Sequence, residues 1–396
     1  MDLSAIQKAL KSAGVDGWLF YDFHNRDAIA SRILQMDANR FTSRRWFYFI
    51  PTEGEPQKLV HKIEPWKCDH LPGKKLVYLP WQQLHSLLQS MLGNAKKIAM
   101  QYSPNNAIPY VSIVDGGTID LLRSFGFEIV SSADLVSQFE SYLSMEDYKS
   151  HIEAGRIMQM VKDEAFKEIA RRIKAGIKTT EFEIQQYMHD MMRKNNMTWP
   201  DGPVVAVNEH AADPHFEPTA ENTYEMKEGD LVLIDLWAKL NTKGSIFYDI
   251  TWMGYIGTEV PQKLEDIFQI ARKGRDTAHQ LVIDRFAANK PLFGWEVDNA
   301  CRKVIDDAGY GDYFTHRTGH NIGEEVHGNG VHIDNLETKD ERQIIPGTCF
   351  SIEPGIYIEE EKIGFRTEID VFVTDESKVE VIGAIQETMI PILNLV

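Results

Sequence analysis

Four acidic residues inside apolar, strand-forming segments constrain this chain more than any other sequence feature. Each is flanked by the β-branched, aromatic and aliphatic residues that favour buried strands. They are Asp235 in DLVLIDLW, Asp249 in IFYDIT, Glu353 in CFSIEPG and Glu368 in RTEIDVFV. A buried carboxylate carries a large desolvation cost unless a partner or a cation satisfies it. The fold must therefore bring these side chains to positive charge.

The first two carboxylates are predicted to face each other across a hairpin. Asn241-Thr-Lys-Gly244 lies between the two strands and is a strong turn signal. If the hairpin is centred on Thr242, Asp235 and Asp249 lie directly opposite, with side chains about 5 Å apart on one face. Two such carboxylates repel each other unless a cation lies between them. The alternative is that one aspartate is a strand-end residue that faces water.

The second two carboxylates repeat the pattern near the C-terminus. Glu359-Glu-Glu-Lys362 is a polar turn centred where Glu353 and Glu368 would pair. Pro354 interrupts this register, because proline lacks the N–H that a strand ladder needs. Two hairpins that each present a carboxylate pair indicate a cation site more strongly than either hairpin alone.

A nitrogen ligand is predicted in the segment HRTGHNIGEEVH, which runs from His316 to His327. Glycines flank His320 and allow the backbone to approach a ligand cluster. Four carboxylates carry a formal charge of −4, which two divalent cations neutralise. Oxygen-rich ligation with one imidazole suits Mn²⁺, with Zn²⁺, Fe²⁺ or Co²⁺ as competitors. Two cations held in this way form an established hydrolytic device.

The length of 396 residues favours two domains. Residues 1–140 alternate short helices and strands, which is typical of an α/β layer, and present no catalytic constellation. Ser144-Met-Glu-Asp147 resembles a capping box and opens a long helix, so the second domain is expected over 145–396. That domain is predicted to be α+β, with helices outside a mostly antiparallel sheet. Its helices are expected at 145–173, 180–192, 261–287 and 295–308, and its strands at 204–207, 230–237, 246–254 and beyond 318.

Charge and cysteine content narrow the class of protein. The net charge is −17 with no dense block of Lys or Arg, so nucleic acid and anionic membranes are poor partners. The N-terminal residues do not resemble a signal peptide, and no segment has the apolar length of a membrane span. The three cysteines are widely spaced and are expected to be reduced. We expect a cytoplasmic location.

The ordered motifs DLW…YDIT, HRTGHNIG…VH, SIEPG and RTEID make the chain resemble the methionine aminopeptidase/prolidase/creatinase family. The resemblance implies a catalytic domain with the pita-bread fold, preceded by a smaller creatinase-like α/β domain. It is closest to the Xaa-Pro peptidases, prolidase and aminopeptidase P. The implied activity is hydrolysis of the Xaa-Pro bond in dipeptides or short peptides by attack of a hydroxide that bridges two metals. It also implies a homodimer.

The resemblance implies a role for each matching residue. Asp249 and Glu368 are similar to the carboxylates that bridge both metals, and Asp235 to a ligand of one metal. His320 and Glu353 are similar to ligands of the other metal, and Glu353 also to the proton acceptor. Four further positions match the family. His215 matches the histidine that contacts the substrate near the scissile bond, and His327 matches the one that stabilises the oxyanion or orients the substrate. His316 and Arg366 match positions beside the ligands and on the substrate side. His210 and His332 are assigned no role.

Three positions depart from the family pattern. Asp235 and Asp249 are 14 positions apart, which is a wider spacing than usual. Gly328 follows His327 where an acidic residue is common, and Trp252 stands where many relatives carry Arg. The last two are expected to alter the pocket beside the metals, which leaves dipeptidase and aminopeptidase action both open.

Two alternatives belong to other functional classes. One is a metal-free amidinohydrolase like creatinase, a branch that lacks the metal carboxylates. The other is a non-catalytic binding module on the same fold, a class that typically loses ligands. Both conflict with the intact set Asp235, Asp249, His320, Glu353 and Glu368.

Overall fold

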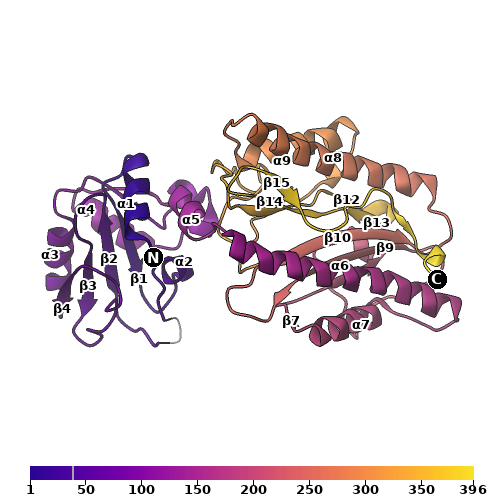
Figure 1. Ribbon diagram of the computed structural model, residues 1–396, viewed down its shortest axis with the longest axis horizontal. Coiled ribbons are helices and arrows are strands. Elements are labelled where there is room, and N and C mark those ends of the chain that lie inside the picture. The colour runs from indigo at the N-terminus through magenta and orange to yellow at the C-terminus, as the bar shows by residue number, and fades with distance from the viewer. Residues whose placement is uncertain (38–39) are drawn as a thin grey trace. The chain divides into compact units, whose positions relative to one another are not determined.

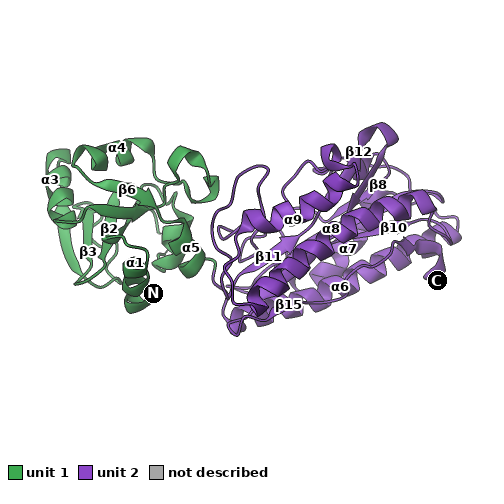
Figure 2. Cartoon of the chain, turned by 90° about the horizontal axis from the view of Figure 1, so that it is seen from above, with its two compact units in different colours: residues 1–141 green, residues 142–396 purple. Residues whose placement is uncertain are grey.

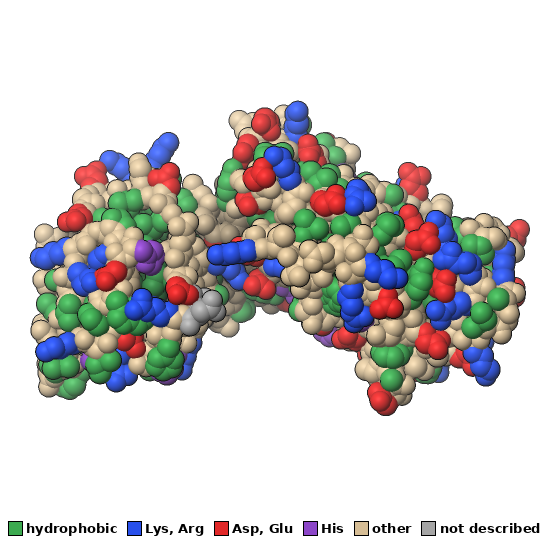
Figure 3. Space-filling view, turned by 60° about the horizontal axis from the view of Figure 1, so that its bottom comes forward, with side chains coloured by type: hydrophobic (Ala, Val, Ile, Leu, Met, Phe, Trp, Pro, Cys, Tyr) green, Lys and Arg blue, Asp and Glu red, His purple; other side chains and the backbone are tan. Residues whose placement is uncertain are grey.

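The structure is a computed structural model that describes residues 1–37 and 40–396. The chain divides into two compact units, Met1–Ser141 and Tyr142–Val396, which are coloured separately in Figure 2. Within the described residues no helix is both long and apolar enough to cross a bilayer. On the face seen in Figure 3, acidic and basic side chains are interspersed.

The N-terminal unit is a six-stranded sheet in the order β4-β3-β2-β1-β5-β6, with helices packed around it. Strands β1 and β2 pair antiparallel, whereas β1 pairs parallel with β5, and β5 with β6. The strands are β1 (Gly17–Asp22), β2 (Trp46–Pro51), β3 (Gln57–His61), β4 (Lys74–Tyr78), β5 (Lys97–Met100) and β6 (Glu128–Ser131). The helices are α1 (Leu3–Ser12), α2 (Ala28–Ile33), α3 (Trp81–Leu92), α4 (Gly116–Ser124) and α5 (Ala133–Phe139). This is the predicted α/β layer.

The C-terminal unit is built from four long helices and several short sheets. Its helices are α6 (Met145–Lys174), α7 (Glu181–Lys194), α8 (Gln262–Ala287) and α9 (Gly294–Asp307). Its strands are β7 (Met197–Thr198), β8 (Val204–Val207), β9 (Leu231–Leu240), β10 (Tyr248–Tyr255), β11 (Cys349–Ile352), β12 (Gly355–Ile358), β13 (Ile363–Arg366), β14 (Ile369–Val373), β15 (Val379–Val381) and β16 (Ile390–Pro391). In Figure 1, α6 and α7 lie on one side of the strands and α8 and α9 on the other.

Capping residues set the starts of α6 and α7 where the sequence predicts them. The Ser144 hydroxyl accepts from the backbone N–H of Asp147, whose carboxylate accepts from the N–H of Ser144. Thr180 and Glu183 form the same reciprocal pair at the start of α7. Each pair satisfies two N–H groups that a helix start leaves without intrahelical partners.

Strand β9 is buried on both faces, and its alternation places the site. Val232, Ile234 and Leu236 pack in the core formed with α6 and α7. Leu231 and Leu233 pack in the core formed with α8 and α9. Because side chains alternate along a strand, Asp235 shares the α8/α9 face with Leu231 and Leu233. The acidic side chain therefore enters the interior of the unit, between the two helical layers.

Candidate metal centre

The β9–β10 hairpin brings Asp235 and Asp249 to one face but not directly opposite each other. Asp235 pairs with Thr251, and Asp249 pairs with Trp237. The predicted direct pairing of Asp235 with Asp249 is therefore wrong, because the residue opposite Asp235 lies two positions after Asp249. The hydroxyl of Ser245 donates to the carbonyl oxygens of Leu240 and Thr242 at 2.5 and 2.8 Å, which centres the connection one residue beyond Thr242. An offset of two keeps both carboxylates on the same face, because strand side chains repeat every two residues.

Glu353 and Glu368 occupy the paired positions that the sequence predicts. Ile352 pairs with Ile369 in one ladder and Gly355 with Arg366 in the next, so both ladders share one register. The ladder is interrupted between them, where Pro354 has no N–H to donate. The backbone N–H of Glu353 instead donates to Thr318 O at 2.7 Å, and that of Glu368 to Thr251 O at 3.3 Å. The interruption therefore ties each glutamate to another ligand-bearing segment.

His320 is held against Glu353 by a close approach of two backbones. Its N–H donates to the Ser351 hydroxyl at 2.9 Å, and that hydroxyl donates to Glu353 Oε1 at 3.0 Å. A Cβ on Gly319 would lie 1.9 Å from Ser351 O, so only glycine fits there. The His320 Nε2 atom lies 3.1 Å from Glu353 Oε1 and 3.6 Å from Asp249 Oδ2.

The predicted ligands converge in the interior of the unit. Asp249, His320 and Glu368 each place one ligand atom within 4.8 Å of the other two. Asp235 joins through Arg366, whose Nη2 donates to Asp235 Oδ2 at 2.5 Å. The Thr251 hydroxyl links the two halves, because it accepts from Arg366 Nε at 3.2 Å and donates to Glu368 Oε2 at 2.8 Å. One connected network therefore contains all five predicted ligands.

The pKa values of the carboxylates in this network shift in opposite directions. Burial, followed by repulsion from Asp235, raises the pKa of Asp249 well above the usual range. Burial, followed by repulsion from Asp249, does the same for the pKa of Glu368. Burial also raises the pKa of Asp235, although Arg366 opposes that shift. For Glu353, burial is outweighed by His320, His316 and Arg366, which lower its pKa. Glu353 is thus the carboxylate that stays ionised most readily.

Unsatisfied oxygens show that this network fits divalent cations. Asp235 Oδ1, Asp249 Oδ1 and Glu368 Oε1 are buried and have no hydrogen-bond partner. Native proteins rarely leave such acceptors unpaired, because each costs about 1–3 kcal/mol or more. Carboxylate oxygens with one imidazole nitrogen form a donor set that suits Mn²⁺ and its neighbours. The residues present therefore fit a metal.

Of the two histidines with predicted catalytic roles, His327 contacts a predicted ligand, whereas His215 hydrogen-bonds to a residue outside the ligand set. The His327 ring packs edge-on against His320, with 4.2 Å between ring centroids. His320, followed by burial and Arg317, lowers the pKa of His327 to about 3, and His215 adds to this shift. His327 is therefore neutral near pH 7. The His215 side chain is exposed, and its backbone N–H donates to Asp213 Oδ1 at 2.9 Å.

His316 and Arg366 meet at Tyr357, which the sequence analysis missed. The His316 Nδ1 atom lies 2.7 Å from Arg317 O and is therefore the protonated nitrogen. Its Nε2 then accepts from the Tyr357 hydroxyl at 2.8 Å, and that hydroxyl accepts from Arg366 Nη1 at 2.8 Å. Burial lowers the pKa of His316 to about 4, which keeps the ring neutral. Tyr357 alternates with Gly355 on β12, but nothing in the sequence marks it as a partner of Arg366.

The sequence also did not predict the contacts of Thr251 and Asp370, although only the second lacks any local signal. Thr251 lies two residues after Asp249, so strand alternation alone places both on one face. Asp370 accepts from the backbone N–H of Asp249 at 2.7 Å. This bond joins β10 to β14, and no local pattern predicts it.

Trp252 does not lie beside the ligands, contrary to expectation. It packs in the core formed with α6 and α7, and the Lys162 Nζ atom lies 3.5 Å from its ring centre. Alternation along β10 points Asp249 and Thr251 to the opposite face. Trp252 therefore lies on the α6/α7 side of the sheet and not in the space beside the ligands.

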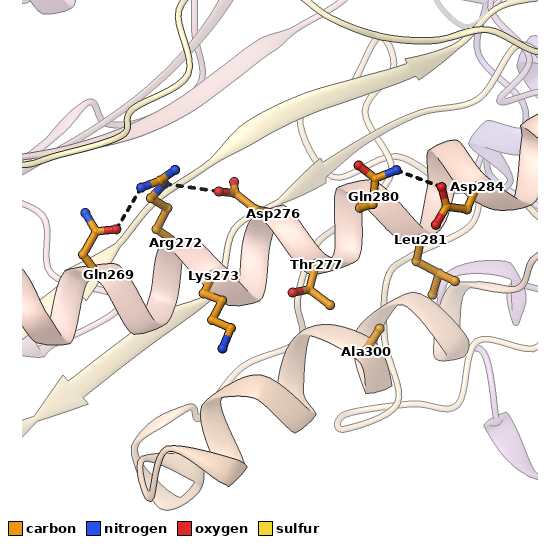
Figure 4. A pocket seen from close by; sticks show the side chains of 9 residues that line it. All are labelled: Gln269, Arg272, Lys273, Asp276, Thr277, Gln280, Leu281, Asp284 and Ala300. Carbon is orange, nitrogen blue, oxygen red and sulfur yellow. Dashed lines mark hydrogen bonds and ion pairs between the residues drawn. The ribbon is translucent and has the colours of Figure 1, made fainter.

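A separate groove lies on α8, and it is lined by polar side chains together with Leu281 of α8 and Ala300 of α9 (Figure 4). Arg272 bonds there with Gln269 and Asp276. None of the five predicted ligands lines this groove.

Comparison with known proteins gives one family and one fold. Residues 153–375 match the model of metallopeptidase family M24. An Xaa-Pro dipeptidase of Lactobacillus delbrueckii subsp. lactis is 38% identical over 155 residues, which are 39% of this chain and 38% of that protein. An Xaa-Pro dipeptidase of Pyrococcus furiosus is 27% identical over 268 residues, which are 64% of this chain and 72% of that one. The chain thus spans about two fifths of the length of the Lactobacillus relative.

Solved structures match the whole chain. A dipeptidase of Mycobacterium ulcerans superposes with a TM-score of 0.69 at 20% identity, covering 98% of this chain and 96% of that one. A prolidase of Thermococcus sibiricus gives a TM-score of 0.64 at 20% identity, covering 98% and 99%. The predicted pita-bread fold with its preceding α/β domain is thereby confirmed.

Proposed function

Because the chain belongs to metallopeptidase family M24, we propose that it is a metal-dependent exopeptidase that hydrolyses the peptide bond before proline in short peptides. The observation that carries this proposal is the set of three buried, unsatisfied carboxylate oxygens on Asp235, Asp249 and Glu368. The proline preference rests on likeness to relatives named Xaa-Pro dipeptidase.

In this proposal five residues hold two divalent cations, with Mn²⁺ favoured over Zn²⁺, Co²⁺ or Fe²⁺. Asp249 and Glu368 would be shared between the two cations, Asp235 would help to hold one, and His320 and Glu353 would help to hold the other. The bound cations would supply a Lewis acid for the substrate carbonyl and would depress the pKa of water. The charge of −4 on the four carboxylates makes such a site favourable.

The chain's own residues move the proton and stabilise charge. The lowered pKa of Glu353 keeps it ionised and its Oε1 accepts from the Ser351 hydroxyl, so it can take a proton from the attacking water. It then delivers that proton to the leaving nitrogen. His327 and His215 donate hydrogen bonds to the oxyanion that develops on the scissile carbonyl. The neutral His327 ring keeps one N–H with which it can donate.

Arg366 orients the site rather than the substrate in this arrangement. Its three nitrogen donors reach Asp235, Thr251 and Tyr357. It therefore fixes the Asp235 carboxylate, whose second oxygen remains available to a cation. His316 holds the far side of Tyr357 and completes the support.

The metal-free alternative is not favoured, because it leaves the buried oxygens of Asp235, Asp249 and Glu368 without any partner. The homodimer and the cytoplasmic location remain part of the proposal. Light scattering of the purified chain and cell fractionation test them.

A product-analysed peptide panel tests the activity. Xaa-Pro, Xaa-Pro-Yaa and Met-Ala-Yaa peptides are incubated with the purified protein and Mn²⁺, Zn²⁺, Co²⁺ or Fe²⁺. We expect cleavage before proline, and two metal ions per chain by elemental analysis. Glu368→Gln should lose activity and metal, whereas Glu153→Gln, at an exposed ion pair on α6, should retain both. Cleavage of Met-Ala-Yaa alone would overturn the proline assignment and leave the metal site intact.

A further inference from the structure

We propose that Glu181 and His210 form a positioning pair that holds residues 208–216 in place and so sets the location of His215. The inference rests on the proposed function only for the role of His215. The sequence assigns no role to His210, and Glu181 carries no motif beyond its place at the start of a helix.

Glu181 joins three segments of the unit through one buried carboxylate. It lies at the first residue of α7 and is fully buried. Its oxygens accept from the backbone N–H of Val207 at 2.7 Å, from that of Tyr224 at 2.7 Å and from His210 Nδ1 at 2.8 Å. A buried carboxylate is tolerated when it is hydrogen-bonded in this way. The end of β8, the short helix His210–Ala212 and the segment at Tyr224 are therefore fixed to one point.

His210 is held by its ring as well as by its nitrogen. The ring stacks between Phe216 and Tyr224, with 3.8 Å between centroids on each side and interplanar angles of 20° and 8°. Phe216 is buried and directly follows the exposed His215. The stack therefore anchors the residue next to His215, while Glu181 fixes the rotation of the ring.

The same segment is fastened on its other side to β13, the strand that leads to the ligands. A Cβ on Gly364 would lie 1.8 Å from Ala211 O, so the two backbones are in direct contact. The Glu209 carboxylate accepts from Lys362 Nζ at 3.1 Å and from the Tyr224 hydroxyl at 3.3 Å. Strand β13 continues into Arg366 and Glu368. Residues 208–216 are thus clamped between α7 and the hairpin that carries two predicted site residues.

This arrangement has a kinetic consequence for a group that acts on the reacting atoms. Misplacement of a catalytic group by about 1 Å can cost on the order of 100-fold in rate. A substitution that loosens the clamp should therefore lower kcat more than it changes KM. It should act only through His215.

A double-mutant cycle tests the pathway. His210→Phe keeps an aromatic ring between Phe216 and Tyr224 but removes the hydrogen bond to Glu181. We expect it to lower kcat about 10-fold with little change in KM. In a His215→Ala background the same substitution should cause almost no further loss, because coupled residues are not additive. Additive losses in the double variant would overturn the proposal.

The matched control is His85→Phe. His85 also contacts two aromatic rings, with edge-on contacts to Trp81 and Phe125, but it lies in the N-terminal unit. This variant should match the wild type in both kcat and KM.

Hydrogen exchange measures the clamp without reference to activity. In metal-free protein, amides of residues 208–217 should exchange faster in His210→Phe than in wild type, whereas those of α8 should not change. Unchanged exchange in 208–217 would refute the clamp even if the enzyme is active. If the wild type cleaves no peptide at all, the proposed function fails, and the exchange result still decides the clamp.

Discussion

Gly328 and Asn321 fit each other so closely that neither position accepts an ordinary exchange. The Gly328 N–H donates to Asn321 O at 2.8 Å, and a Cβ on Gly328 would lie 2.2 Å from Asn321 Oδ1. The Asn321 side chain also accepts from Gly330 N–H and donates to Cys349 O, both at 2.9 Å. The absence of an acidic residue after His327 therefore follows from the asparagine after His320.

Gly328→Ala should destabilise the protein by about 1–3 kcal/mol, because overpacking forces Asn321 from its hydrogen bonds. Asn321→Gly should lose a similar amount by deleting those bonds. In the Asn321→Gly background, however, Gly328→Ala should cost much less, because the clashing oxygen is gone. Thermal melts of the four proteins give the coupling, and strictly additive effects would show that the two residues do not share this space.

Removal of metal should reverse the effect of Asp249→Asn on stability. In metal-free protein at pH 8, the wild type confines carboxylates whose charging is opposed by burial and mutual repulsion. The free energy of unfolding of the Asp249→Asn variant should therefore exceed that of the wild type by about 1–3 kcal/mol, and the variant should melt at a higher temperature. With excess Mn²⁺ the wild type should melt higher, because the cation binds only its folded site. A variant that melts below the wild type in both conditions would contradict a cation-dependent site.

Trp252→Arg should be severely destabilising, since it places a second cation beside Lys162 in a buried layer. We expect a loss of about 3–5 kcal/mol. Trp252→Phe retains an aromatic face for the Lys162 ammonium and should be folded. Because Trp252 points away from Asp249, Trp252→Phe should leave the ranking of peptide substrates unchanged. A changed ranking in this folded variant would place the residue in the substrate pocket after all.

The N-terminal unit should lose stability as the pH rises from about 4 to 7. Burial, assisted by repulsion from Asp22, outweighs the Ala30 N–H and raises the pKa of Asp27 from 3.8 to about 7. The folded state then holds a proton that the unfolded chain releases, so the stabilising contribution is full at low pH and is lost through this window. The loss is at most about 4 kcal/mol.

Asp27→Asn isolates this contribution. The amide oxygen can still cap α2 by accepting from Ala30 N–H, as the carboxylate does at 2.7 Å. Calorimetry at about pH 4.5 and about pH 7.5 covers most of this titration window. We expect the melting temperature of the variant to change less between these two pH values than that of the wild type. Parallel pH profiles for the two proteins would assign the effect to other groups.

The register of one ligand-bearing hairpin could be predicted from the sequence, and the register of the other could not. The pairing of Glu353 with Glu368 could be predicted, because the turn between them is symmetric in both ladders. The pairing of Asp235 with Asp249 could not, because Ser245 shifts the connection through bonds from its hydroxyl to backbone carbonyls. Alternation kept both aspartates on the correct face even though the register was wrong.

Contacts between segments that are distant in the chain could not be predicted from the sequence. Tyr357, Asp370 and the Glu181–His210 pair act through partners that no local spacing reveals. In the N-terminal unit, the alternation of short helices and strands could be predicted from the sequence. Strand β4 is largely exposed, so it lacks the apolar signature of a buried strand.

The interrupted ladder at Pro354 has a consequence for the order of folding. The N–H groups of Glu353 and Glu368 bond to Thr318 and Thr251, which lie 35 and 117 positions earlier in the chain. Contacts between such distant positions form late, because the chain loses the entropy of loop closure before these contacts stabilise it. The five proposed ligands therefore come together only when the β12–β13 hairpin docks, and a chain still growing toward residue 368 presents an incomplete set.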